Sequence, residues 1–218
     1  MPEALPPPLP PAERTVGQLV AESIRLYGRR FWPSLALGVG PAILNVLVRT
    51  LDHWITLVLL PTIGGLVLAA SYGGAVGIAA GRPIRVLPAL VAGTIVFVPF
   101  PFLVTIFVLP GLVWLAAFGL VVPVVALEGR GLVDGFRRAL ALARADFVHA
   151  LGSLATLAIV VFLTQSMLFF VLRGFGDQAL EAASFIASLV VSPLLFLGSA
   201  LLYFDQEARE DVRDVPRR

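Results

Sequence analysis

The chain has 218 residues, of which 58% are hydrophobic and only 14% are charged, and its mean hydropathy is +0.93. A typical soluble domain is about 45–50% apolar and about 25% charged, so this composition excludes an ordinary soluble enzyme and indicates a polytopic membrane protein. There is no cysteine, which excludes disulfides and thiolate metal sites. All sixteen basic residues are arginine, which excludes lysine Schiff-base and P-loop chemistry. We therefore expect a non-enzymatic protein without a cofactor or metal and without a nucleic-acid partner.

The N-terminal segment is rich in proline and lacks the basic and apolar regions of a secretory signal. We predict a disordered, Pro-rich cytoplasmic tail over 1–13. A six-helix transmembrane domain is expected over 14–206, followed by a charged cytoplasmic tail over 207–218.

Six segments are long and apolar enough to cross about 30 Å of hydrocarbon as helices. The predicted spans cover residues 32–48, 54–80, 88–109, 112–127, 150–172 and 182–204. Pro61 predicts a kink in the second span. Pro110-Gly111 predicts the turn between the third and fourth spans. The predicted fold class is all-α.

The arginines predict the orientation of these spans. If the N-terminus is cytoplasmic, only Arg49 and Arg173 lie on the outer side, and all other arginines lie on the inner side. Such a bias is the positive-inside pattern. It predicts a multi-pass protein of the bacterial cytoplasmic (inner) membrane, with both termini in the cytoplasm.

Two segments, about 15–31 and 131–148, are amphipathic and are predicted to be interfacial helices on the cytoplasmic side. Thr15-x-x-Gln18 predicts a capping box at the start of the first. Their apolar positions coincide after a shift of about 116 residues, and each precedes a transmembrane hairpin, which suggests a repeat. A short third copy would begin at residues 81–85. The alternative is that any basic amphipathic helix shows this spacing.

Small residues at intervals of four predict close helix packing in the second and sixth spans. The packing candidates are Gly65, Ala69, Gly73 and Gly77 in the second span and Ser184, Ser188 and Ser192 in the sixth. We expect the two stripes to pair, either within one chain or between subunits.

Four residues within the spans are candidates for lining a substrate cavity. Asn45 and Gln165 are the strongest polar groups there, while Pro99 and Pro101 interrupt the third span. Broken helices form binding sites in many transporters. Interhelical hydrogen bonds and structural kinks are the alternative, and the simpler, explanation.

Charged residues at the ends of the predicted helices are candidates for interfacial salt bridges or contacts with lipid headgroups. They are Arg25, Arg29, Arg30, Glu128, Arg137, Arg138, Arg144, Asp205 and Arg209. The expected partners are the lipid bilayer and anionic phospholipid headgroups. A homo-oligomer or a membrane-protein partner is a further expectation.

Three stretches carry a family resemblance: Leu26–Phe31, Pro123–Phe147 and Leu201–Asp214. The chain resembles a bacterial family of six-helix integral membrane proteins, mostly uncharacterised, related to the membrane domain of some glycerophosphodiester phosphodiesterases. Glu207 stands where this family would have a basic residue. The resemblance implies a fold and a membrane location. It implies no phosphodiesterase activity, which belongs to a separate soluble barrel.

Two functions follow as hypotheses. The leading hypothesis is a structural, organisational or accessory protein of a membrane or envelope process. The alternative is a small permease or lipid-handling transporter with a path near the Pro99–Pro101 helix break, Asn45 and Gln165. A water-accessible cavity between the helices would favour the transporter over the structural or accessory protein.

Overall fold

The computed structural model describes residues 10–173 and 176–214, and within these ranges the regular structure is helical, with no strand. The helices before the first hairpin turn are η1 (Pro11–Glu13), α1 (Val16–Arg29), α2 (Phe31–Ala36) and α3 (Val39–Thr50). Those of the central part are α4 (His53–Leu59), η2 (Leu60–Gly64), α5 (Gly65–Ala80), α6 (Val86–Phe97), α7 (Phe100–Ile106), α8 (Val108–Phe118), α9 (Val121–Pro123) and η3 (Val124–Glu128). The last are α10 (Leu132–Ala145), α11 (Phe147–Leu172) and α12 (Asp177–Asp214).

Six helical stretches are long and apolar enough to cross a membrane, which confirms the predicted number of spans. They are Phe31–Thr50, His53–Ala80, Val86–Ile106, Val108–Glu128, Phe147–Leu172 and Gln178–Arg213. Each matches a predicted segment, and the predicted boundaries differ chiefly at the third, fourth and sixth stretches.

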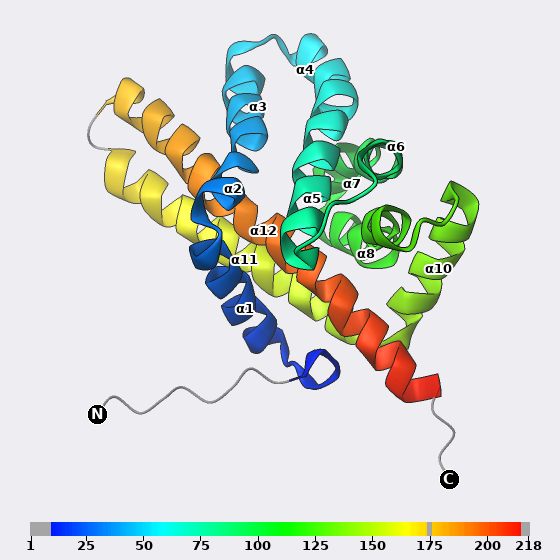
Figure 1. Cartoon of the computed structure of the whole chain (residues 1–218). Helices are drawn as coiled ribbons and strands as arrows, with labels where there is room; N and C mark the ends of the chain where they lie inside the picture. Colours follow the sequence, from blue (N-terminus) through cyan, green and yellow to red (C-terminus); the bar gives the residue numbers. More distant parts are fainter. Residues whose placement is uncertain (1–9, 174–175, 215–218) are drawn as a thin grey trace, which may run out of the picture.

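The bundle has two ends that the following sections refer to by name (Figure 1). The terminal end holds η1, the start of α11 and the end of α12, which Figure 1 shows at the bottom. The hairpin end holds the turn between α3 and α4, the end of α11 and the start of α12, at the top of the same view. α12 runs between the two ends and packs against α11, α3, α5, α1 and α10. Its buried side chains, including Leu197 and Tyr203, meet Tyr72 and Phe97 in the main core.

Prolines account for the irregular turns in the spans. The predicted kink at Pro61 lies in η2, a π-helical turn that joins α4 to α5, because proline cannot donate the backbone hydrogen bond that a regular turn needs. The predicted break in the third span is also present, since α6 ends at Phe97 and α7 begins at Phe100. Pro101 falls in the first turn of α7, where an N–H group would have no helical partner.

The turn predicted at Pro110-Gly111 is wrong. The chain turns at Phe107, whose backbone is extended, and Pro110 lies in the first turn of α8. Proline is tolerated in the first turn of a helix, so Pro110, which suggested a turn, lies instead within the beginning of α8. Gly111 is buried, and an added Cβ would lie 2.6 Å from the Val104 side chain of α7.

Helices α1 and α10 have matching boundaries. Each has 14 residues, and a shift of 116 carries Val16–Arg29 onto Leu132–Ala145 and the following break at Arg30 onto Asp146. The two buried positions of α1, Leu19 and Ser23, correspond to Gly135 and Ala139 of α10, which buries Leu142 and Ala143 as well. The predicted capping box is present: Thr15 Oγ1 accepts from the Gln18 N–H, and Gln18 Oε1 accepts from the Thr15 N–H at 2.8 Å.

Three predicted segments differ in the structure. Residues 81–85, proposed as a third copy, form a non-helical connection that begins at Gly81, a left-handed helix cap with φ of 63°. Within the predicted tail 1–13, residues 1–9 lie outside the described part of the chain and Pro11–Glu13 form η1. Within the predicted tail 207–218, α12 continues to Asp214.

Candidate functional site

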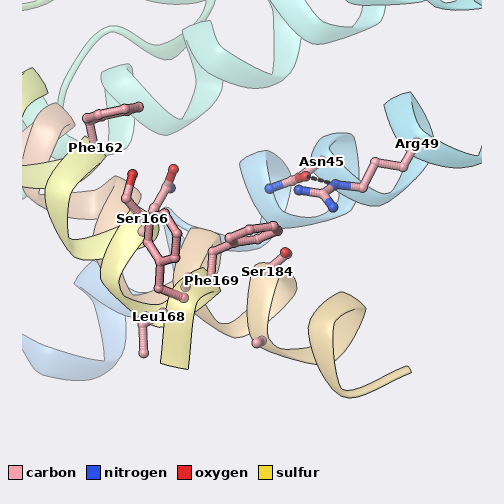
Figure 2. Close-up of a pocket in the computed structure, with 11 residues that line it drawn as sticks. Asn45, Arg49, Phe162, Ser166, Leu168, Phe169 and Ser184 are labelled. Atoms are coloured by element: carbon pink, nitrogen blue, oxygen red, sulfur yellow. Dashed lines mark hydrogen bonds between the residues drawn. The ribbon is translucent and has the colours of Figure 1, made fainter. Parts of the chain in front are cut away.

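A polar cavity of about 220 Å³ lies at the hairpin end, between α3, α11 and α12 (Figure 2). It is lined by Asn45, Arg49, Phe162, Gln165, Ser166, Leu168, Phe169, Phe170, Ala183, Ser184 and Ala187. Two of the four predicted cavity residues, Asn45 and Gln165, therefore line one cavity although 120 positions separate them. No carboxylate is among its lining residues.

Asn45 joins the two sides of this cavity. Its Nδ2 donates to Ser188 Oγ of α12 at 2.6 Å, and its Oδ1 accepts from Arg49 Nε at 3.0 Å. The second bond turns the Arg49 side chain back along α3, as Figure 2 shows. Asn45 is thus bonded on both sides, whereas Arg49, among the described residues, uses only its Nε atom and both Nη groups remain available on an exposed residue.

Three further polar side chains border the cavity: Gln165, Ser166 and Ser184. No described residue forms a hydrogen bond with any of them, whereas neighbouring Thr164 and Ser192 donate to backbone carbonyls one turn back. In a protein that spans a membrane, such groups are costly unless water or a ligand satisfies them. The cavity therefore presents free hydrogen-bonding groups beside one cation.

The helix break is not part of this cavity. Pro99 and Pro101 lie at the junction of α6 and α7, and neither is among the residues that line it. Phe100, between them, packs on Phe97 and the main core. The structure therefore does not place the break at the cavity that Asn45 and Gln165 line, and Phe100 packs at the break against the core.

The glycine stripe and the serine stripe do not face each other within the chain. The neighbours of Gly73 and Gly77 lie in α6 and the connection before it, and Gly65 lies next to Val98 at the end of α6. An added Cβ on Gly93 of α6 would lie 2.6 Å from the Ala69 Cβ. In the serine stripe, Ser188 bonds to Asn45 of α3, Ser192 donates to the Ser188 carbonyl and Ser184 borders the cavity. The small residues of α5 thus allow close contact with the next helix in sequence.

An ion-pair network at the terminal end surrounds Asp205, whose side chain is fully buried. Arg14 Nη1 donates to Asp205 Oδ1 at 2.9 Å, and His149 Nε2 lies 3.8 Å from Asp205 Oδ2. Arg209 follows Asp205 by one helical turn but does not pair with it. Instead it donates to Asp146 Oδ2 at 2.8 Å and to the Arg14 carbonyl. The network thereby ties the segment before α1, the junction of α10 and α11, and α12 together.

A second group of charges surrounds Glu128 at the end of η3. Arg130 lies 2.5 Å and Arg138 3.6 Å from its carboxylate, and Tyr203 donates to it at 3.1 Å. Arg138 also pairs with Glu210 of α12. Burial lowers the pKa of Arg138, but the hydrogen bond and charge of Glu210 outweigh this and hold the pKa above its ordinary value. These contacts fasten α10 to α12.

The remaining interfacial candidates lie at the surface. Arg25 pairs with Glu22 within α1, and Arg137 lies 3.9 Å from Asp134 within α10. Arg29, Arg30 and Arg144 are exposed. Exposed arginines beside exposed apolar residues such as Ile24 and Val133 give both helices a mixed outer surface.

Sequence reasoning missed Arg14, Asp146 and His149. One signal was present: Asp146 immediately precedes an apolar span and caps α11 by accepting from the His149 N–H at 3.0 Å. Arg49 was assigned only to the outer side, and its place in the cavity follows from its position one turn after Asn45.

Within residues 10–173 and 176–214, no group of three or more histidine, aspartate or glutamate side chains is arranged to hold a metal ion. The six long apolar helices define the class: a multi-pass α-helical membrane protein. Comparison with protein-family models, with curated proteins and with solved structures finds no match to this chain.

Proposed function

We propose that this chain is a non-enzymatic protein of the bacterial cytoplasmic membrane, with both termini in the cytoplasm, that organises the membrane or assists an envelope process. The terminal end would lie at the anionic inner leaflet, with α1 and α10 in the interface. The relation to the six-helix family suggested by the sequence is part of the same proposal.

The observation that carries this proposal is the pairing of charges at the terminal end. The described charged side chains around Asp205 and Glu128 form ion pairs that join the segment before α1, α10, the α10–α11 junction and α12. Such pairing holds helices in place and leaves the outer arginines of α1 and α10 for lipid headgroups. The matching boundaries of these two helices support a repeat of interfacial helix plus hairpin.

The interfacial placement of α1 predicts a contrast between two adjacent positions. Ile24 is 52% exposed and the Arg25 side chain is 41% exposed, so accessibility alone does not separate them. In vesicles with anionic lipid, we expect Ile24→Cys to resist a membrane-impermeant thiol reagent and Arg25→Cys to react. The chain has no native cysteine, so each label reports a single site.

Detergent-solubilised protein is the control, because both cysteines should react there. Equal labelling of the two positions in vesicles would contradict an interfacial α1. Reaction of Asp134→Cys only from outside oriented vesicles or cells would overturn the proposed orientation.

The cavity at Asn45 and Gln165 favours a second candidate function, a lipid-handling or small permease protein. It predicts that Gln165→Cys reacts with a water-soluble thiol reagent, while Phe100→Cys, at the helix break, stays unreactive. Accessibility is measured as the fraction of each variant labelled in vesicles. An unreactive Gln165→Cys alongside a reactive Asp52→Cys, at the exposed turn before α4, would remove this candidate.

A further inference from the structure

We propose that the hairpin-end cavity binds the phosphate-bearing headgroup of an anionic lipid, with Arg49 as the cation that recognises it. This inference deepens the second candidate function by naming a ligand class. It requires only binding, so it stands even for a protein that moves no lipid.

The charge of the cavity selects an anion. Arg49 is its only charged lining residue, and the described carboxylates nearest in sequence, Asp52 and Glu181, do not line it. The guanidinium is oriented by its bond to Asn45, and a preoriented guanidinium suits the paired oxygens of a phosphate. Gln165, Ser166 and Ser184 supply hydrogen-bonding groups that no described protein group uses.

The size and walls of the cavity select a headgroup attached to apolar chains. About 220 Å³ is smaller than the roughly 300–1,000 Å³ of common small-molecule sites, so a headgroup fits while acyl chains must lie outside. Phe162 and Phe170 line the cavity and are 67% and 63% exposed. They continue its wall onto the outer surface of α11, which in a bilayer meets lipid.

The depth of the cavity agrees with this ligand. Gln165 lies seven residues before the end of α11 at Leu172, which corresponds to about 10 Å along a helix. Arg49 lies in the last turn of α3. The cation is therefore near the membrane surface, where phosphate groups of lipids lie, and Phe162, ten residues before the end of α11, is deeper.

The test is lipid binding by purified full-length protein, measured by native mass spectrometry from detergent during titration with dioleoyl phosphatidylglycerol. We expect Arg49→Gln to weaken binding about tenfold, as for loss of one charge-assisted hydrogen bond. The charge-matched control is Arg173→Gln, at the same end, because Arg173 stacks on Phe170 but does not line the cavity. A thermal unfolding curve of each variant confirms that it is folded.

If Arg49→Gln and Arg173→Gln weaken lipid binding equally, the lipid is attracted by the general positive charge of this end, and the proposed site is wrong. Equal binding of phosphatidylcholine would overturn the selection for a net anion. Inorganic phosphate that binds without lipid, and is lost in Arg49→Gln, would assign the cavity to soluble phosphate instead. These outcomes are independent of the Gln165→Cys labelling, so a dry cavity and a wrong ligand are distinguishable.

Discussion

Replacing Asp205 by alanine is expected to lower the free energy of unfolding by about 3–5 kcal/mol, the cost of breaking a buried ion pair on one side. The carboxylate is fully buried between Arg14 and His149. Its loss leaves Arg14, whose side chain is 15% exposed, without a counter-charge. Thermal unfolding of the detergent-solubilised protein, followed by tryptophan fluorescence, measures the effect.

The control is Asp134→Ala on α10. Its side chain is 68% exposed and lies 3.9 Å from Arg137, so we expect a change within about 1 kcal/mol. Asp205→Asn keeps the shape of the side chain, but it should lower the free energy of unfolding nearly as much as Asp205→Ala, because an amide cannot neutralise Arg14. Similar stability of Asp205→Ala and Asp134→Ala would show that the terminal network contributes nothing.

Replacing Gly38 by alanine is expected to destabilise the protein by about 1–3 kcal/mol through overpacking. A Cβ at this position would lie 2.0 Å from the carbonyl oxygen of Leu189 in α12. That carbonyl lies four residues before Pro193, the proline inside α12, which has no N–H to donate to it. Gly38 thus covers a backbone oxygen that lacks its helical partner, and a larger residue must push α3 away from α12.

Gly28→Ala in α1 gives the matched comparison. Apart from the local backbone of α1, nothing lies within 4 Å of a Cβ added there, and alanine is preferred to glycine in helix interiors by about 0.5–1 kcal/mol. The same substitution should therefore stabilise at one site and destabilise at the other, as measured by unfolding temperature. If Gly38→Ala also unfolds at or above the wild-type temperature, α3 and α12 are not in the close contact described.

The six spans and the two 14-residue helices could be predicted because their signals are local. Length and hydropathy locate a span, and the capping box Thr15-x-x-Gln18 locates the start of α1. The turn at Phe107 could not be predicted, since nothing in that apolar stretch distinguishes it from its neighbours. Pro110-Gly111 is compatible with both a turn and the first residues of a helix.

The candidate sites were predictable only in part because they depend on contacts between distant segments. Arg14 and Asp205 are 191 positions apart, and no local pattern links them. The glycine stripe of α5 could be recognised as a packing surface, but the choice of α6 over α12 depends on how hairpins assemble. Asn45 and Gln165 were identified as polar residues within spans, where polar groups are scarce and therefore conspicuous.

Helix α12 contributes to both ends of the molecule, with Ser184 and Ser188 at the cavity and Asp205 and Arg209 in the terminal network. Pro193 lies between these two sets of residues, where one missing hydrogen bond makes the helix easier to bend. The two ends are therefore joined by one helix with a flexible point near Pro193, and Gly38 contacts the helix at this point. A small bend at Pro193 can move the part of α12 that lines the cavity and so change the width of the cavity. The part of α12 after Pro193 stays held by the ion pairs of the terminal network.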